Sequence, residues 1–113
     1  MLTFEKAKIC YETIRDADLS TRLHPLRREM YLRALDYARI RADWMVSSRE
    51  ERIAMDQRRR LAHTAFIDAC NILSRNMGNE GEDNSWRAKL GDDRKVIGDF
   101  ACHLHAILGI EAR

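Results

Sequence analysis

Four long stretches of the chain repeat their apolar residues at steps of three and four positions. Residues spaced in this way line one face of an α-helix, whereas a half-buried strand requires strict alternation. The stretches run from Phe4 to about Leu19, from Pro25 to about Val46, from Ser48 to about Met77 and from Asp92 to about Gly109. Because only short connections separate them, the pattern predicts an all-α protein, a four-helix up-and-down bundle.

Residues that favour helix starts stand in front of these stretches. Thr3 and Asp92 are predicted N-caps, because their side-chain oxygens can accept a hydrogen bond from a free backbone N–H. Ser48-Arg49-Glu50-Glu51 has the form of a capping box. Pro25 suits the first turn of a helix, where its missing N–H costs nothing.

Turn-forming residues mark the last part of the chain. Residues 78 to 84 are rich in Gly, Asn and acidic side chains and are predicted to form a loop. A short extra helical turn from Ser85 to Leu90, closed by Gly91, is expected before the last helix. Gly109 is expected to end that helix.

Composition indicates one folded domain covering residues 1–113. The sequence is 45% hydrophobic and 34% charged, with one Pro and five Gly, which is too apolar for a disordered chain. Three widely spaced cysteines in apolar surroundings, Cys10, Cys70 and Cys102, favour free buried thiols over disulfides. No signal peptide or run of about 20 apolar residues is evident. We therefore expect a cytoplasmic protein without a membrane partner.

Positive charge is concentrated in the second and third predicted helices. Between Arg22 and Arg60 there are eleven Arg and six acidic residues, a local excess of five positive charges. Arg binds carboxylates and phosphates through two hydrogen bonds at once, so this region is a candidate partner-binding face. The predicted partner-binding residues are Arg49, Arg52, Arg58, Arg59, Arg60, Trp86 and Arg87. The alternative is a set of solvated helix faces with i,i+4 ion pairs.

Two tryptophans are candidates for either packing or binding. Trp86 and Arg87 lie beside the predicted loop and are typical interface anchors, although a Trp in this position can also fasten the loop to the core. Trp44 and Met45 continue the apolar stripe of the second helix. We predict that these two residues belong to the core.

Metal and cofactor motifs are absent. The sequence has no C-x-x-C pair, no Glu-x-x-His pair and no phosphate-binding glycine loop. Asp99 and His103 are four residues apart, but a single pair of this kind is more often a surface interaction than a metal site. No cofactor and no metal are expected.

The second half of the chain resembles a known family. The segments His63 to Arg75 and Ser85 to Cys102 look like a group of small helical proteins of Firmicutes and their mobile elements, which is classed as a domain of unknown function. The resemblance implies an all-helical fold and a bacterial, mobile-element origin. It assigns no catalytic residue.

A shorter segment resembles the signature of HEPN ribonucleases. Arg58 to His63 has their R-x4-H form, in which the Arg binds the scissile phosphate and the His acts as acid or base. The resemblance implies these roles for Arg58 and His63. Two departures oppose it: Arg59 replaces the usual small polar residue, and the motif is not in the last helix.

The sequence favours a non-enzymatic interaction module, an accessory or inhibitor protein of a mobile element if the family resemblance holds. It is expected to bind a protein or a nucleic acid through its Arg-rich helices, RNA rather than specific DNA, because no helix-turn-helix geometry is evident. A HEPN-like ribonuclease is the alternative. A homodimer is also expected if the long third helix leaves apolar surface uncovered.

Overall fold

The computed structural model describes residues 1–17, 22–77, 86–91 and 93–112, and these residues contain helices and no strand. The helices are α1 (Phe4–Ala17), α2 (His24–Met45), α3 (Arg49–Met77), α4 (Trp86–Leu90) and α5 (Arg94–Glu111). The prediction of four long helices with a short extra turn before the last one is confirmed. The predicted end of the first helix at Leu19 and the predicted loop at 78–84 lie outside the described residues.

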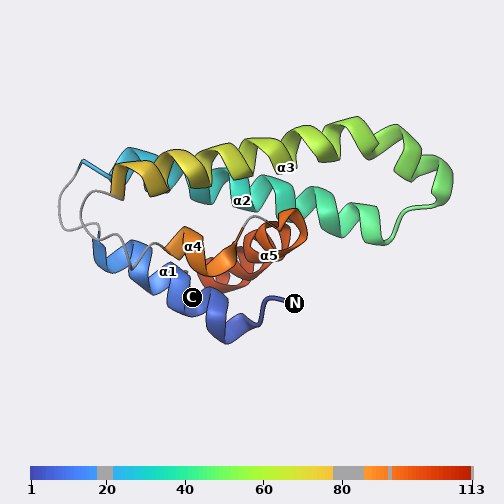
Figure 1. The fold of residues 1–113 in the computed structure, drawn as a ribbon. Coiled ribbons are helices and arrows are strands. Elements are labelled where there is room, and N and C mark those ends of the chain that lie inside the picture. Colours follow the sequence, from blue (N-terminus) through green and yellow to red (C-terminus); the bar gives the residue numbers. More distant parts are fainter. Residues whose placement is uncertain (18–21, 78–85, 92, 113) are drawn as a thin grey trace.

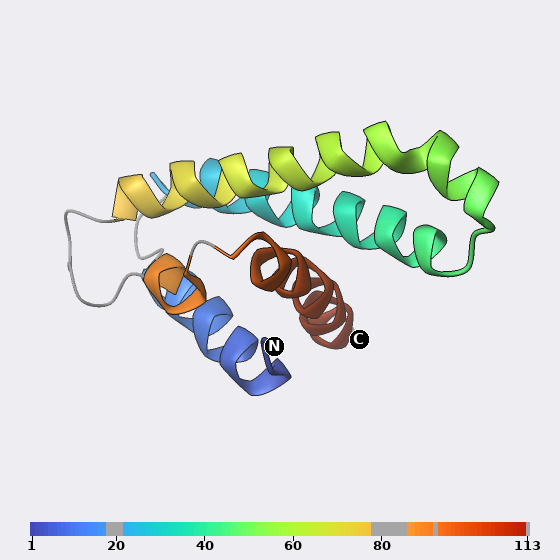
Figure 2. The same cartoon turned by 45° about the vertical axis from the view of Figure 1, so that its right-hand side comes forward.

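The helices form two layers. α2 and α3 make an antiparallel hairpin, and α1, α4 and α5 lie together on one side of it (Figure 1). After a turn of the view, α1 and α5 are seen to run across the hairpin instead of parallel to it (Figure 2). The N-terminal end of α5 therefore meets the hairpin near its middle.

Local hydrogen bonds explain where three helices begin. The backbone N–H of Lys6 donates to Thr3 Oγ1 over 3.2 Å, which confirms the predicted cap of α1. The capping box is also confirmed: the Ser48 N–H donates to Glu51 Oε1 at 2.8 Å, and the Glu51 N–H donates to Ser48 Oγ at 3.2 Å. For α5 the cap is Asp93, which accepts from the Lys95 N–H at 2.8 Å. The predicted cap, Asp92, is outside the described residues.

The expected stop at Gly109 is wrong, because α5 continues to Glu111. Gly109 lies inside the helix, and Gly91 is the only described glycine with a positive φ, at 73°. The continuation of α5 to Glu111 has a tertiary reason: the Tyr11 hydroxyl donates a hydrogen bond to the Glu111 carboxylate, which also lies 3.8 Å from Arg15 Nη1. These contacts fasten the end of α5 to α1.

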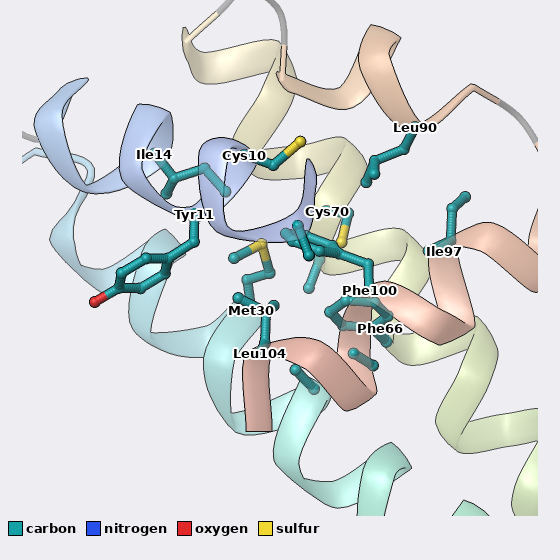
Figure 3. Packing of buried hydrophobic residues seen from close by; sticks show 14 of the residues in the cluster. Cys10, Tyr11, Ile14, Met30, Phe66, Cys70, Leu90, Ile97, Phe100 and Leu104 are labelled. Carbon is teal, nitrogen blue, oxygen red and sulfur yellow. The ribbon is translucent and has the colours of Figure 1, made fainter. Parts of the chain in front are cut away.

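Apolar side chains from all five helices meet in one core. Phe100 of α5 packs between Phe66 of α3, at a ring-centroid distance of 6.2 Å, and Trp86 of α4, at 5.7 Å. Phe100, Phe66 and Leu104 are completely buried, and Met30 of α2 lies beside them (Figure 3). Most of the bundle's stability is expected to come from this cluster, because helix propensity alone contributes little in a protein of this size.

The three described cysteines are free, as predicted. Cys10 and Cys70 are buried among core residues, and Cys102 is half-buried. Burial raises the pKa of each of these thiols, which disfavours the reactive thiolate. None of the described helices combines the length and the apolar character that a membrane span requires.

The tip of the α2–α3 hairpin extends beyond the core. The first buried residue of α3 is Ala62, more than three turns after the helix begins at Arg49. At the tip, Met45, Val46 and Ile53 are 66%, 87% and 69% exposed. The prediction that Met45 is a core residue is therefore wrong, because α1, α4 and α5 do not reach the tip (Figure 1).

A matched pair of leucines tests the position of the core. Leu104→Ala removes a completely buried side chain and should lower the free energy of unfolding by about 2–5 kcal/mol. Leu61→Ala, the same change at a side chain that is 64% exposed, should alter it by less than about 0.5 kcal/mol. Urea unfolding followed by circular dichroism measures both, and equal losses would contradict this description of the core.

Candidate functional site

A hollow opens where the middle of the hairpin meets the N-terminal end of α5, and we call it the basic groove. Its volume is about 610 Å³. Side chains of α2, α3 and α5 line it: Tyr37, Arg41, Trp44, Met45, Arg59, Arg60, His63, Arg94 and Lys95. Three segments that are far apart in the sequence thus contribute to one cationic and aromatic surface.

Two carboxylates neutralise only part of the positive charge around the groove. Asp99 lies 2.9 Å from Arg41 Nη1 and 3.6 Å from Lys95 Nζ. Asp56 lies 3.0 Å from Arg59 Nη2 and also pairs with Arg60. Hydrogen bonds from Arg60 and Arg59 lower the pKa of Asp56, so it is ionised at neutral pH.

The balance of these charges is strongly positive. Among the described residues, five cationic side chains line the groove, and four of them pair with the two carboxylates; counted with Arg94, they leave three positive charges in excess. Arg60 and Lys95 are also well exposed, with 74% and 68% of their side chains accessible. An anionic ligand could therefore reach cations that the protein itself does not fully neutralise.

The floor of the groove consists of two rings that pack against α5. Tyr37 and His63 have a centroid separation of 4.9 Å, and both residues are buried. They fit because position 98 is a glycine: a Cβ there would lie 3.2 Å from Tyr37 Oη and 3.3 Å from His63 Nε2. Gly98 thus permits the close approach of α5 to these rings.

His63 is held as a neutral, hydrogen-bonded base. Its Nε2 lies 2.9 Å from the carbonyl oxygen of Arg94, and because a carbonyl only accepts, Nε2 carries the proton. Burial lowers the pKa of His63, and the positive charges of Arg94, Arg59 and Arg41 lower it further, although the hydrogen bond acts in the opposite direction. His63 therefore adds no charge to the groove at neutral pH.

Trp44 forms a ridge at the edge of the groove. It also lines a second hollow of about 350 Å³ at the hairpin tip, together with Arg49, Arg52, Ile53 and Asp56. The guanidinium carbons of Arg59 and Arg52 lie over the Trp44 ring, at 4.4 and 5.5 Å from its centroid. The prediction that Trp44 is a core residue is wrong, since it is only partly buried and stands outside the core cluster.

The structure divides the five predicted partner-binding arginines of α3 among three places. Arg59 and Arg60 line the basic groove, and Arg49 and Arg52 line the hollow beyond Trp44. Arg58 lies elsewhere, in an outer groove between α2 and α3 with a volume of about 550 Å³. Leu61, beside Arg58, is mostly exposed, so the expected homodimer has a candidate surface there and stays a prediction.

Arg58 and His63, the pair implied by the HEPN resemblance, line different grooves. Five residues along an α-helix correspond to a rotation of about 140°, which turns the two side chains apart. Arg58 lines the outer groove and His63 the basic groove. The Nε2 of His63 is also occupied by its hydrogen bond to Arg94. Within one chain, the two residues do not face a common phosphate.

The predicted binding role of Trp86 is wrong, because this residue is 1% exposed and packs on Phe100. The alternative, a Trp that fastens the chain to the core, is confirmed. Arg87 makes internal contacts: its Nε donates to Asn71 Oδ1 at 3.0 Å and its Nη1 donates to the Gly91 carbonyl. Both residues support α4 in its place against α1 and α3.

Sequence reasoning missed Tyr37 and Arg41 of α2 and Arg94 and Lys95 of α5. Arg94 and Lys95 were within a locally acidic segment and gave no cationic signal. The usable signal was Gly98, a glycine in the middle of a strongly apolar helical stripe. Such a glycine indicates that another group approaches the backbone closely.

The described residues offer no metal site: no group of three or more His, Cys, Asp or Glu side chains is placed to hold an ion. Asp99 is engaged by Arg41 and Lys95, and His103 Nε2 lies 2.9 Å from the Leu2 carbonyl. The two residues thus have separate partners. The chemistry that the site offers is binding of anions and stacking on aromatic rings.

Two glycines of α5 provide a test of the groove floor. Gly109→Ala adds a methyl group with no atom within 4 Å and should stabilise the protein by about 0.5–1 kcal/mol through helix propensity. Gly98→Ala should be less stable than Gly109→Ala by at least about 1 kcal/mol, because Tyr37 and His63 must move. Urea denaturation compares the two variants, and equal gains would contradict the close packing described here.

The neutral state of His63 predicts a pH dependence of stability. The folded protein disfavours protonation of this ring, so below its ordinary pKa of 6.5 the unfolded chain binds a proton that the folded chain does not. The free energy of unfolding should therefore decrease as the pH is lowered from about 7.5 to about 5. His63→Gln should show a smaller decrease over the same interval, whereas His105→Gln, at an exposed position, should behave as the wild type. Parallel decreases in all three proteins would show that His63 is not responsible.

No protein-family model, curated protein or solved structure matches this chain. The resemblances to a helical Firmicutes family and to HEPN ribonucleases therefore stay predictions. The function has to be inferred from the chain's own residues, chiefly from those that line the basic groove.

Proposed function

We propose that this chain is a non-enzymatic binding module whose basic groove holds phosphate groups of RNA. The observation that carries the proposal is the excess of three positive charges that the described residues give to a groove also lined by Tyr37 and Trp44. Phosphate contacts supply most of the affinity of such sites and make it depend on salt. Aromatic side chains beside cations are typical of proteins that bind unpaired bases.

The cationic surface continues past the groove. Arg49 and Arg52 line the neighbouring hollow, so cations from Arg49 to Arg60 follow one side of α3 over about 16 Å. A chain of phosphates could bind along this length. Small anions would use only part of it, which favours a polymer over a metabolite as the ligand.

Cleavage of the bound RNA is not part of the proposal. General acid–base catalysis needs a titratable group within hydrogen-bond reach of the reacting oxygen. The buried Nε2 of His63 is engaged by the Arg94 carbonyl, and Arg58 lines the outer groove. These observations favour binding over the HEPN-like alternative.

A charge-removal experiment tests the proposal. Arg60→Ala combined with Lys95→Ala removes two well-exposed cations of the groove and should weaken RNA binding at low salt. It should also reduce the slope of log affinity against log salt by about 1.4, if each cation contacts one phosphate of a single strand. A mobility shift with labelled RNA at two or more salt concentrations provides both values.

The matched control, Lys8→Ala combined with Arg28→Ala, removes the same charges from exposed positions that do not line the groove. It should leave the affinity within about twofold of the wild type, and so should Arg58→Ala. Equal weakening by both double variants would show non-specific attraction, and no shift at low salt would refute the proposal. RNA cleavage that is abolished by His63→Ala would favour the ribonuclease alternative.

A further inference from the structure

We propose that the Trp44 ridge stacks an unpaired base, so that the module selects single-stranded over double-stranded RNA. This inference rests on the proposed function and adds the form of RNA that the groove accepts. Trp44 stands between the basic groove and the hollow at the hairpin tip, and lines both. Trp44 is the residue that the two hollows have in common, so a strand that occupies both would pass beside this ring.

The chemistry around Trp44 suits a base with phosphates on each side. Arg59 and Arg60 lie on the groove side, and Arg49 and Arg52 lie on the tip side. A nucleotide chain alternates flat apolar bases with charged phosphates, and single-strand-binding proteins match it with aromatic rings between cations. The order of cations, aromatic ring and cations across Trp44 has this pattern.

The exposed apolar residues at the tip support the same inference. Met45 lines the basic groove and Ile53 the tip hollow, each together with Trp44, and Val46 follows Met45 in the turn; all three are more than half exposed. A double helix buries its bases in the stack and presents mainly phosphates and sugars to a protein, so these apolar side chains would contribute nothing to its binding. An unpaired base can bury them, which explains why apolar and cationic side chains share this surface.

Trp44 also orients two of the cations. The Arg52 guanidinium donates to the Trp44 and Met45 carbonyls, at 2.8 and 3.2 Å, and the Arg59 guanidinium lies 4.4 Å from the ring centroid. Loss of the ring would leave the backbone hydrogen bonds of Arg52 in place but would remove the ring contacts of both arginines, so binding could weaken simply because Arg59 above all loses its position. A test must separate this positioning role from base stacking.

The native fluorescence of the chain allows this separation. The protein has two tryptophans, and Trp86 is 1% exposed in the core whereas Trp44 lies at the proposed contact. A single-stranded RNA should quench the wild-type emission. Heparin, a polyanion without bases, should bind without this quenching. In Trp44→Phe, where only Trp86 emits, the RNA should cause no quenching.

Affinities complete the experiment. Trp44→Leu should weaken the binding of single-stranded RNA by about 5- to 150-fold, as expected for one lost base stack, and should change the affinity for heparin and for duplex RNA by less than about twofold. Equal weakening of all three ligands would mean that Trp44 only positions Arg59 and Arg52, and would overturn the inference. So would equal wild-type affinity for duplex and single strand, or wild-type binding of RNA without quenching.

These outcomes are distinct from failure of the proposed function. If neither RNA nor heparin binds the wild type at low salt, the basic groove is not a phosphate site, and the proposed function fails with the inference. If heparin and both forms of RNA bind equally well, the groove binds polyanions, and only the role of Trp44 is refuted. An acidic protein as the true partner would give this second pattern.

Discussion

The packing of α5 across the α2–α3 hairpin is the interaction on which the rest of the structure depends. The buried stripe of α5, with Ile97, Phe100 and Leu104, covers the middle of the hairpin and also contacts α1 and α4. Burial of these side chains is the main favourable contribution to folding that this bundle has. It also fixes the site, because it sets the first turn of α5, with Arg94 and Lys95, beside Arg59 and Arg60 of α3.

The groove keeps an excess of positive charge although its cations lie close together in the folded protein. Asp56 and Asp99 each pair with two cations, so the repulsion between neighbouring guanidinium groups is reduced without being abolished. His63 stays neutral at the floor of the groove, because a positive charge on its buried ring would be poorly solvated and would be repelled by three arginines. The folded chain therefore keeps its excess charge near the surface, where a partner can reach it.

Local sequence signals predicted the helices well, because helix ends depend on neighbouring residues. The capping box at Ser48 and Glu51 is an example, since both of its hydrogen bonds span only three residues. The stop at Gly109 was wrong for the opposite reason: Tyr11, a hundred residues away in the sequence, holds Glu111 and keeps the last turn helical. Contacts between such distant residues cannot be predicted from the residues beside the helix end.

The site was predicted only in part, and the errors in that prediction also come from contacts between residues that are distant in the sequence. The arginines of α3 were identified by their number, but which of them share a groove depends on the rotation of the helix against α2 and α5. Trp44 and Trp86 show this most clearly, because each was assigned the environment that the other has. Exposure is a property of the assembled bundle, and Trp86 is covered by the core while Trp44 stands where the core ends.

One contact at the hairpin tip connects the binding of a ligand with the order of the backbone at the end of α2. Arg52 caps the C-terminal end of α2 by donating to two of its last carbonyl groups, a favourable position for a cation at the negative end of a helix. A phosphate that drew this guanidinium away would leave those carbonyls to the solvent and loosen the final turn of α2. Occupancy of the tip hollow and order of the interhelical turn are therefore thermodynamically linked, and each must alter the other by the same free energy.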